Sequence, residues 1–143
     1  MNLRAALEAY AHIFPPEATK PTIERLTDIY RARFTPPSRG LVLEEGGVVV
    51  GCVAAAVDED GEGEVVGLYV DPSRWREGLG ALLLGEVVAD LRDAGATSAR
   101  LWVLEHNTRA RGMYERRGWE ADGATRRVST VGGVIELRYR LAL

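Results

Sequence analysis

The segment from Val70 to Ala81 constrains this chain more than any other, because it joins two different periodic patterns. An apolar strand pattern, Glu64 to Val70, runs into a basic loop, and an apolar helix pattern begins beside Gly78 and Gly80. The first turn of a helix has unpaired N–H groups and the positive end of the helix dipole. Glycine has no Cβ and lets an anion come close to the backbone. The segment therefore predicts a ligand that carries a phosphate, bound at the start of this helix.

The residues after Gly80 decide which kinds of phosphate loop fit. A P-loop NTPase needs Gly-Lys-Ser/Thr, but Ala81 and Leu82 follow Gly80, so the lysine and the magnesium-binding hydroxyl are missing. A Rossmann dinucleotide site needs a further glycine where this chain has Leu83, so it fits poorly. A helix that starts in a glycine-containing loop without binding any ligand remains the structural alternative.

A second segment, Leu101 to Trp119, reads as an apolar strand, a polar loop and a short helix closed by a glycine and an aromatic residue. Together the two segments resemble the GNAT superfamily of acyl-CoA N-acyltransferases. The first family signature is a Leu-Tyr-Val-x-Pro strand followed by Arg/Gln-x-x-Gly-x-Gly/Ala; it is matched by Leu68, Tyr69, Val70, Pro72, Gly78 and Gly80. The second is Asn-x-x-Ala-x-x-x-Tyr-x-x-x-Gly-Phe; it is matched by Asn107, Ala110, Tyr114 and Gly118, with Trp119 in place of Phe.

One position departs from the first signature. The family's usual Arg or Gln, three residues before the first glycine, is Trp75 in this chain, with Arg74 and Arg76 on either side. Main-chain N–H groups carry most of the phosphate binding in such loops, so the loop should still bind a diphosphate. Which of the two arginines contacts phosphate stays open.

The periodic patterns and the resemblance together predict one α/β (α+β) domain over residues 1–143. The sheet is expected to be mixed, mostly antiparallel, of about six strands, splayed centrally, and flanked by about four helices. The expected helices are Leu3 to Phe14, Pro21 to Phe34, Gly78 to Gly95 and a short one after Asn107; the expected strands are 41–45, 48–57, 64–70, 99–104, 119–130 and 134–143. Gly46-Gly47 and Gly132-Gly133 are the expected hairpin turns. The usual first strand of the family is expected to be absent or encoded upstream of Met1.

Composition limits the partners and the setting. The net charge of −3 gives no general attraction for nucleic acid. No apolar run approaches the length of about 18 residues that spans a membrane, and no signal peptide precedes the first helix. One cysteine, Cys52, and two histidines give no plausible zinc site, so no metal is expected. We therefore expect a cytoplasmic bacterial protein, and a missing first strand would leave a sheet edge suited to a homodimer.

The resemblance implies transfer of an acetyl group from acetyl-CoA to an amine. It places the cofactor against Leu68, Tyr69, Val70, Arg74, Arg76, Glu77, Gly78, Leu79, Gly80, Ala81, Asn107, Arg111 and Tyr114. The pantetheine arm would pair with the exposed edge of the strand that ends at Val70. Gly67, in the middle of that strand, predicts a bulge that frees N–H groups for the arm and the thioester oxygen. Tight packing around Gly67 is the alternative.

Two residues are the candidates for acid–base catalysis. By resemblance, the Tyr114 hydroxyl protonates the departing CoA sulfur, a nearly balanced transfer between groups with pKa values of about 10 and about 8.5. The alternative for Tyr114 is a core anchor. Glu64 is the candidate base that removes the amine proton through water, although it could equally be a solvated residue of the acidic stretch 58–64. His106 and solvent stay open as the base.

Three functions compete on these residues. The leading prediction is an N-acetyltransferase that acts on a primary amine of a small molecule or peptide by direct transfer. A non-catalytic acyl-CoA sensor on the same fold is the alternative, and an enzyme of nucleotide phosphates is the third. The amine acceptor cannot be read from the sequence, because residues 14–34 and 121–134, which set it in the family, carry no motif.

Overall fold

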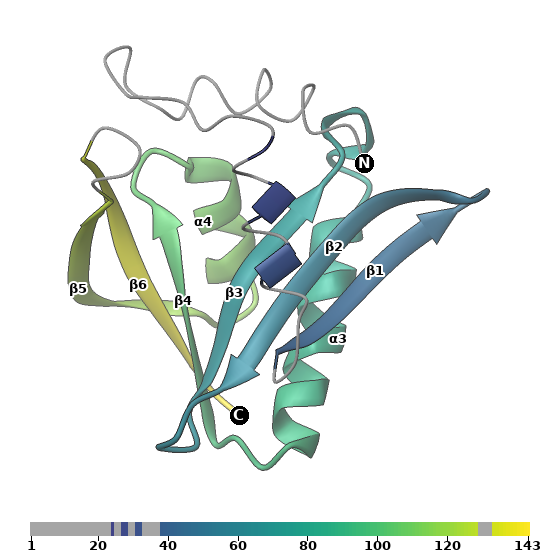
Figure 1. Ribbon diagram of the computed structural model, residues 1–143. Helices are drawn as coiled ribbons and strands as arrows, with labels where there is room; N and C mark the ends of the chain where they lie inside the picture. The colour runs from purple at the N-terminus through teal and green to yellow at the C-terminus, as the bar shows by residue number, and fades with distance from the viewer. Residues whose placement is uncertain (1–23, 25–26, 29–30, 33–37, 129–132) are drawn as a thin grey trace.

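The computed structural model describes residues 24, 27–28, 31–32, 38–128 and 133–143, and these form one sheet with helices packed on it (Figure 1). The strands are β1 (Arg39–Glu45), β2 (Val48–Val57), β3 (Gly63–Val70), β4 (Ser98–Leu104), β5 (Glu120–Val128) and β6 (Val134–Ala142). They lie in the order β1-β2-β3-β4-β6-β5. Only β3 and β4 run parallel within this sheet. The expected mixed, mostly antiparallel sheet of six strands is confirmed.

The helix count differs from the expected four. Two α-helices are described over their full length, α3 (Leu79–Asp93) and α4 (Thr108–Glu115), and a short 3-10 helix, η2 (Pro72–Arg74), precedes α3. Within the second expected helix, residues 24, 27–28 and 31–32 are helical. The rest of that helix, the first expected helix and the question of a first family strand lie outside the described residues. The expected homodimer likewise stays a prediction.

The first hairpin forms as its two glycines predict. Gly46 and Gly47 connect β1 to β2 with φ values of 58° and 80°. Positive φ at both central residues is the type I′ geometry, whose twist matches that of the flanking strands. This hairpin places β1 at one edge of the described sheet.

The sheet is splayed between β3 and β4. The two strands pair through Gly63 with Ala99, Glu64 with Arg100 and Val65 with Leu101. Beyond these pairs they diverge, and Figure 1 shows them meeting at one end and separating toward the other. Within the described sheet, residues 66–70 of β3 therefore have no strand partner on the β4 side. The expected central splay is confirmed.

A bulge lies in β3 where Gly67 predicted one. Ala54 of β2 faces Gly67, but the next residue, Ala55, faces Val65, so Val66 is the extra residue. A bulge interrupts the ladder and turns the local backbone groups away from their regular partners. It falls directly after the last pair between β3 and β4, at the fork of the splay.

The closed end of the splay is held by ion pairs. Arg100 of β4 contacts three carboxylates, with N–O distances of 3.0 Å to Asp58, 2.6 Å to Glu62 and 3.3 Å to Glu64. Arg140 of β6 also pairs with Glu62. These five side chains, here called the Arg100 network, join the β2–β3 turn, β3, β4 and β6.

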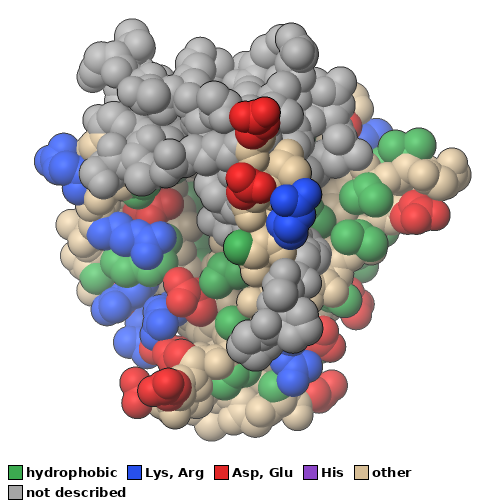
Figure 2. Space-filling model, in the orientation of Figure 1, with side chains coloured by type: hydrophobic (Ala, Val, Ile, Leu, Met, Phe, Trp, Pro, Cys, Tyr) green, Lys and Arg blue, Asp and Glu red, His purple; other side chains and the backbone are tan. Residues whose placement is uncertain are grey.

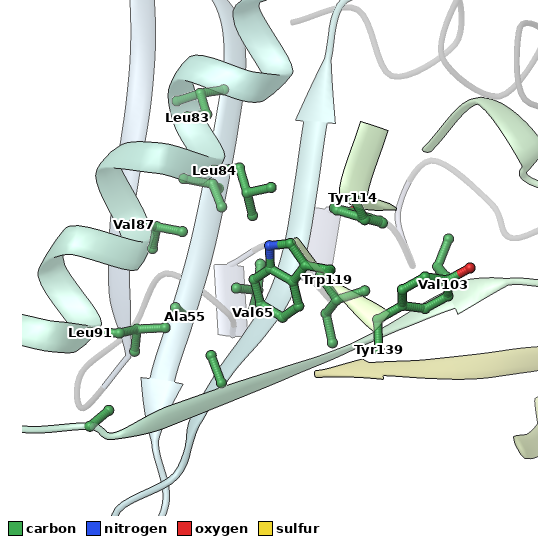
Figure 3. Close-up of a cluster of buried hydrophobic side chains, with 14 of the residues drawn as sticks. Ala55, Val65, Leu83, Leu84, Val87, Leu91, Val103, Tyr114, Trp119 and Tyr139 are labelled. Carbon is green, nitrogen blue, oxygen red and sulfur yellow. The ribbon is translucent and has the colours of Figure 1, made fainter. Parts of the chain in front are cut away.

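The core fills the space between the sheet and the two helices. Leu83, Leu84, Val87 and Leu91 form one buried stripe on α3. They pack with strand residues such as Val65, while Tyr114, Trp119 and Tyr139 fill the half of the core below β4 (Figure 3). This core fixes α3 and α4 on the same side of the splayed strands.

Helix α3 ends as predicted at Gly95, whose φ is 92°. Gly95 N–H donates to the Arg92 carbonyl at 2.9 Å, and Ala96 N–H donates to the Leu91 carbonyl at 3.1 Å. This pair of bonds is the Schellman motif, which satisfies the last carbonyls of a helix. No helix in the described part of the chain is long and apolar enough to cross a membrane.

Charged side chains on the face shown in Figure 2 are of both signs and interspersed. Several are paired across neighbouring strands: Arg126 with Glu136 at 2.6 Å and Arg138 with Asp122 at 2.6 Å. Arg126 also lies over the indole of Trp102, with its Cζ 4.3 Å from the ring centroid. The described part of this face is thus laced by ion pairs between β5 and β6.

Candidate active site

The chain leaves β3 along a path fixed by Asp71. Its backbone N–H donates to the Val50 carbonyl at 2.8 Å. Its Oδ1 accepts hydrogen bonds from the Ser73 hydroxyl at 2.7 Å and from the Ser73 N–H at 2.9 Å. These bonds from Ser73 lower the pKa of Asp71 below its ordinary value. Asp71 thereby caps η2 and directs the loop toward α3.

The loop presents a row of backbone N–H groups at the start of α3. Gly78 is the N-cap, with a φ of 80°, and its carbonyl accepts the first helical bond from Leu82 at 3.0 Å. The six backbone N–H groups from Arg76 to Ala81 have no acceptor among the described residues. Such a row at a positive helix end is suited to an anion with several oxygens, such as a diphosphate. The geometry fits the phosphate site that the sequence predicts.

Each of the two loop glycines has a structural reason of its own. Gly78 needs its left-handed backbone, since a Cβ there would meet nothing within 4 Å. At Gly80 a Cβ would lie 3.3 Å from Met113 Sδ, so glycine allows the close approach of α4. The sequence predicted close approach of an anion, and the structure adds close approach of a side chain.

The two arginines beside Trp75 differ in what they contact. Arg74 binds Glu77, with its Nε 2.8 Å from Oε2, and also pairs with Glu45 of β1. The hydrogen bond from Arg74 lowers the pKa of Glu77, and the same contact raises the pKa of Arg74. Arg76 is exposed and makes no hydrogen bond or ion pair with the described residues. Of the two, Arg76 is the one whose guanidinium is available to a phosphate.

Trp75 is a site residue that the sequence did not identify by role. Its Nε1–H donates to the carbonyl of Val70, the last residue of β3, at 2.9 Å. Its ring packs against the hydrophobic core on one side. The Arg109 guanidinium lies over the ring, with Cζ 3.1 Å from the centroid. The signal was present as the single departure from the first family signature.

Helix α4 starts as predicted at Asn107. The Asn107 side chain accepts a hydrogen bond from the Ala110 N–H at 3.2 Å, which confirms its capping role. Arg111 donates to the Tyr139 hydroxyl at 3.1 Å and to the Glu105 carbonyl at 2.9 Å. The bond to Tyr139 raises the pKa of Arg111. Arg111 therefore braces the turn between β4 and α4, and contact with a cofactor stays a prediction for it.

Tyr114 is buried on the side of α4 that faces the core, with an exposed fraction of 7%. Its ring lies 6.2 Å from those of Trp119 and Tyr139, centroid to centroid, in tilted arrangements (Figure 3). The core role weighed as the alternative is therefore real. It does not conflict with a catalytic role, because Met113, the preceding residue, packs on the loop at Gly80.

The candidate base, Glu64, lies at the closed end of the splay. Its carboxylate is 3.3 Å from Arg100, and its side chain is 27% exposed. His106 lies on the exposed turn that precedes Asn107. No group of three or more His, Cys, Asp or Glu side chains is placed to hold a metal ion in the described part of the chain.

The predicted cofactor residues thus fall into two groups. The loop and the end of β3 bring Leu68, Tyr69, Val70, Arg76, Gly78, Leu79, Gly80 and Ala81 together on one arm of the splay, and Asn107, Arg111 and Tyr114 lie on the other. Arg74 and Glu77 belong to the first arm but bind each other. Glu64 lies at the fork, apart from the loop.

Comparisons with known proteins agree with this arrangement. Residues 3–119 match the sequence profile of the acetyltransferase (GNAT) family. Mycothiol acetyltransferase of Beutenbergia cavernae is 33% identical over 120 residues, which make up 80% of this chain and 39% of that protein. The chain spans less than two thirds of the length of the curated relatives it matches.

Solved structures share the fold. IAA acetyltransferase from Bacillus cereus superposes with a TM-score of 0.71 at 17% identity, covering 84% of this chain and 85% of that one. PaiA N-acetyltransferase from Thermoplasma acidophilum, solved in complex with coenzyme A, gives 0.69 at 18% identity, covering 96% of this chain and 86% of that one. Because the family profile spans most of the sequence, including both the loop and Tyr114, the chain belongs to the acetyltransferase (GNAT) family.

Proposed function

We propose that this chain is an acetyl-CoA-dependent N-acetyltransferase, which moves an acetyl group directly to a primary amine of a small molecule or peptide. The observation that carries the proposal is the row of six N–H groups from Arg76 to Ala81, beside a strand edge left open by the splay. Family membership explains why a diphosphate site and an open edge lie next to each other.

The described residues fit the shape of coenzyme A in two places. The diphosphate would lie on the N–H groups of the loop, with Arg76 as the available guanidinium. The pantetheine arm contains amides, which can pair with the edge of β3 from Val66 to Val70 as an added strand. Together the two contacts would lead the sulfur from the loop toward the fork of the splay.

Acetyl-CoA, when bound, supplies an activated acetyl group and a thiolate that needs a proton on leaving. We assign that proton to the Tyr114 hydroxyl, since the pKa values of a phenol and a thiol, about 10 and about 8.5, allow a nearly balanced transfer. Backbone N–H groups freed by the bulge at Val66 would donate to the carbonyl oxygen, where negative charge develops.

The base is the weakest assignment. We retain Glu64 as the group that takes the amine proton through water, because it lies beside the fork where the acetyl group would be. Its ion pair with Arg100 gives it a structural role as well. His106 and bulk solvent remain the alternatives.

The amine acceptor is open, and the relatives suggest where to begin. A panel should contain simple primary amines, peptides with a free amino end, and the acceptor of the mycothiol acetyltransferases. A non-catalytic acyl-CoA sensor remains the second candidate, because the core packing of Tyr114 explains that residue without any chemistry.

The test is a comparison of the natural chain with Tyr114→Phe. Release of free thiol from acetyl-CoA should depend on an amine, and the variant should turn over about 100-fold or more slowly, because the acid is lost. Coenzyme A binding, measured by calorimetry, should stay within about twofold, since the ring and its packing are kept.

Equal turnover by the two proteins would remove Tyr114 as the acid. Binding of acetyl-CoA with no thiol release across the whole amine panel would favour the sensor instead.

A further inference from the structure

We propose that Trp75 and Arg109 form a bridge across the open end of the splay, which positions the diphosphate loop relative to helix α4 and so to Tyr114. This inference rests on the proposed function, because it assigns positioning residues to the same cofactor site. Neither residue is assigned a chemical step.

The first half of the bridge fixes Trp75 to the β3 arm. The indole Nε1–H donates to the carbonyl of Val70, at the last residue of β3, at 2.9 Å. Directly after Trp75 the backbone turns sharply, since Arg76 has a φ of 71°, which is unusual for a residue with a Cβ. The indole is therefore held at the point where the strand ends and the row of N–H groups begins.

The second half comes from the β4 arm. Arg109 belongs to the first turn of α4, a few residues after β4 ends at Leu104. Its Cζ lies 3.1 Å from the centroid of the Trp75 ring, a distance at which a guanidinium and an indole face attract each other. The contact thus joins the two segments that follow the diverging strands.

A second contact runs beside the first. Met113 lies one helical turn after Arg109, on the same face of α4. A Cβ on Gly80 would lie 3.3 Å from Met113 Sδ, so the two chains approach as closely as glycine permits. Helix α4 therefore touches the loop at both of its ends, at Trp75 and at Gly80, and leaves the N–H groups between them open.

The consequence is a coupling between cofactor grip and catalytic geometry. A diphosphate on the loop can order the thiolate-proximal end of the cofactor only if the loop and the Tyr114 helix keep a fixed distance. The family signature places an Arg or Gln at the position of Trp75, and here the cation comes from α4 while the loop supplies the ring. Losing either partner should loosen both arms.

A double-mutant cycle tests the bridge on coenzyme A affinity. Trp75→Leu and Arg109→Gln should each weaken binding about three- to tenfold, the loss expected for a cation–π contact. The double variant should be no weaker than the weaker single variant, because both changes remove one interaction. Arg109→Lys and Trp75→Phe, which keep a cation and a ring face, should recover part of the affinity.

Arg92→Gln is the matched control, since Arg92 is an exposed arginine at the far end of α3. In turnover, Arg109→Gln should raise the KM for acetyl-CoA and also lower kcat, whereas the control should change neither. Because Arg109 is exposed, its variants should fold even if Trp75→Leu does not, and the contrast between Arg109→Gln, Arg109→Lys and the control then decides the question.

The outcomes separate the bridge from the proposed function. Natural chain that binds coenzyme A, with single effects that multiply in the double variant, would overturn the bridge alone. An equal loss in Arg109→Gln and Arg92→Gln would also overturn it, since charge and not contact would explain the result. Natural chain that binds no coenzyme A would overturn the proposed function together with the bridge.

Discussion

Asp71 shows how much one carboxylate can determine at the exit of a strand. It receives two hydrogen bonds from Ser73, and its own N–H is bound to Val50 of β2. The side chain thereby ties the loop to two strands before the row of N–H groups begins. A change at Asp71 should be seen first in stability and only afterwards in cofactor binding.

Replacing Asp71 by Asn should lower the free energy of unfolding at neutral pH, because the ionised carboxylate is the better acceptor. The pKa of Asp71 is lower in the folded chain than its unfolded value of about 3.9. Its contribution is therefore full above that unfolded pKa and is lost as the pH falls through the folded pKa. Denaturant midpoints of the two proteins should differ at pH 7 and converge below about pH 4.

The control for this series is Asp60→Asn, because the side chain of Asp60 makes no hydrogen bond with the described residues. A difference between natural chain and Asp71→Asn that stays constant with pH would contradict the proposed role of the charge.

The sequence predicted which residues belong to the site better than it predicted what they contact. Asn107 was expected as a cap and is one. Arg74 and Arg111 were expected against the cofactor, yet both bind groups of the protein itself. A motif gives the position of an arginine, but its long side chain selects a partner in three dimensions. The same limit hid Arg109, whose partner is more than thirty residues away.

At the scale of elements, α3 uses glycine in three different ways. Gly78 adopts a left-handed backbone at the N-cap, and Gly80 makes room for Met113. Gly85, in the middle of the helix, has nothing within 4 Å of the place its Cβ would occupy. Only the first two have a structural reason to be glycine.

Alanine substitution should separate these roles. Gly78→Ala should lower the free energy of unfolding by about 1–2 kcal/mol, since a Cβ is strained at positive φ. Gly85→Ala should raise it by about 0.5–1 kcal/mol, because alanine loses less entropy in a helix. Urea denaturation followed by circular dichroism measures both, and a loss of stability in Gly85→Ala would mean that this glycine has a function the structure does not explain.

Elements with local signals were predicted well. The Gly46-Gly47 turn, the bulge beside Gly67 and the cap at Gly95 all follow from the conformations that glycine allows. The parallel pairing of β3 with β4 and the insertion of β6 next to β4 could not be derived in this way. Both are contacts between segments far apart in the chain, which local patterns do not record.

The whole molecule is organised around the splay, which is held at each end by a different force. The Arg100 network holds the closed end through ion pairs. The contacts of α4 with the loop hold the open end through an aromatic ring and a methionine. The width of the splay is thus set by side chains at both ends and not by the strands alone.

Arg100→Gln should lower the free energy of unfolding by about 1–2 kcal/mol at low ionic strength, because three neighbouring carboxylates lose their shared cation. The difference should shrink as salt is added, since Arg100 is partly exposed. Arg126→Gln, which breaks a single pair at a side chain 51% exposed, should cost less than about 1 kcal/mol. Equal losses in the two variants, measured by urea denaturation, would contradict a special role for the network.

The position of β6 affects the order in which this protein can be assembled as it is translated. Strand β6 follows β4 and β5 in the chain but lies between them in the sheet. Until residues 134–142 have left the ribosome, β5 has no partner among the described strands, and β4 has only its three pairs with β3. A nascent chain can therefore build the phosphate loop well before the opposite arm is complete, and competence should appear abruptly with the final strand.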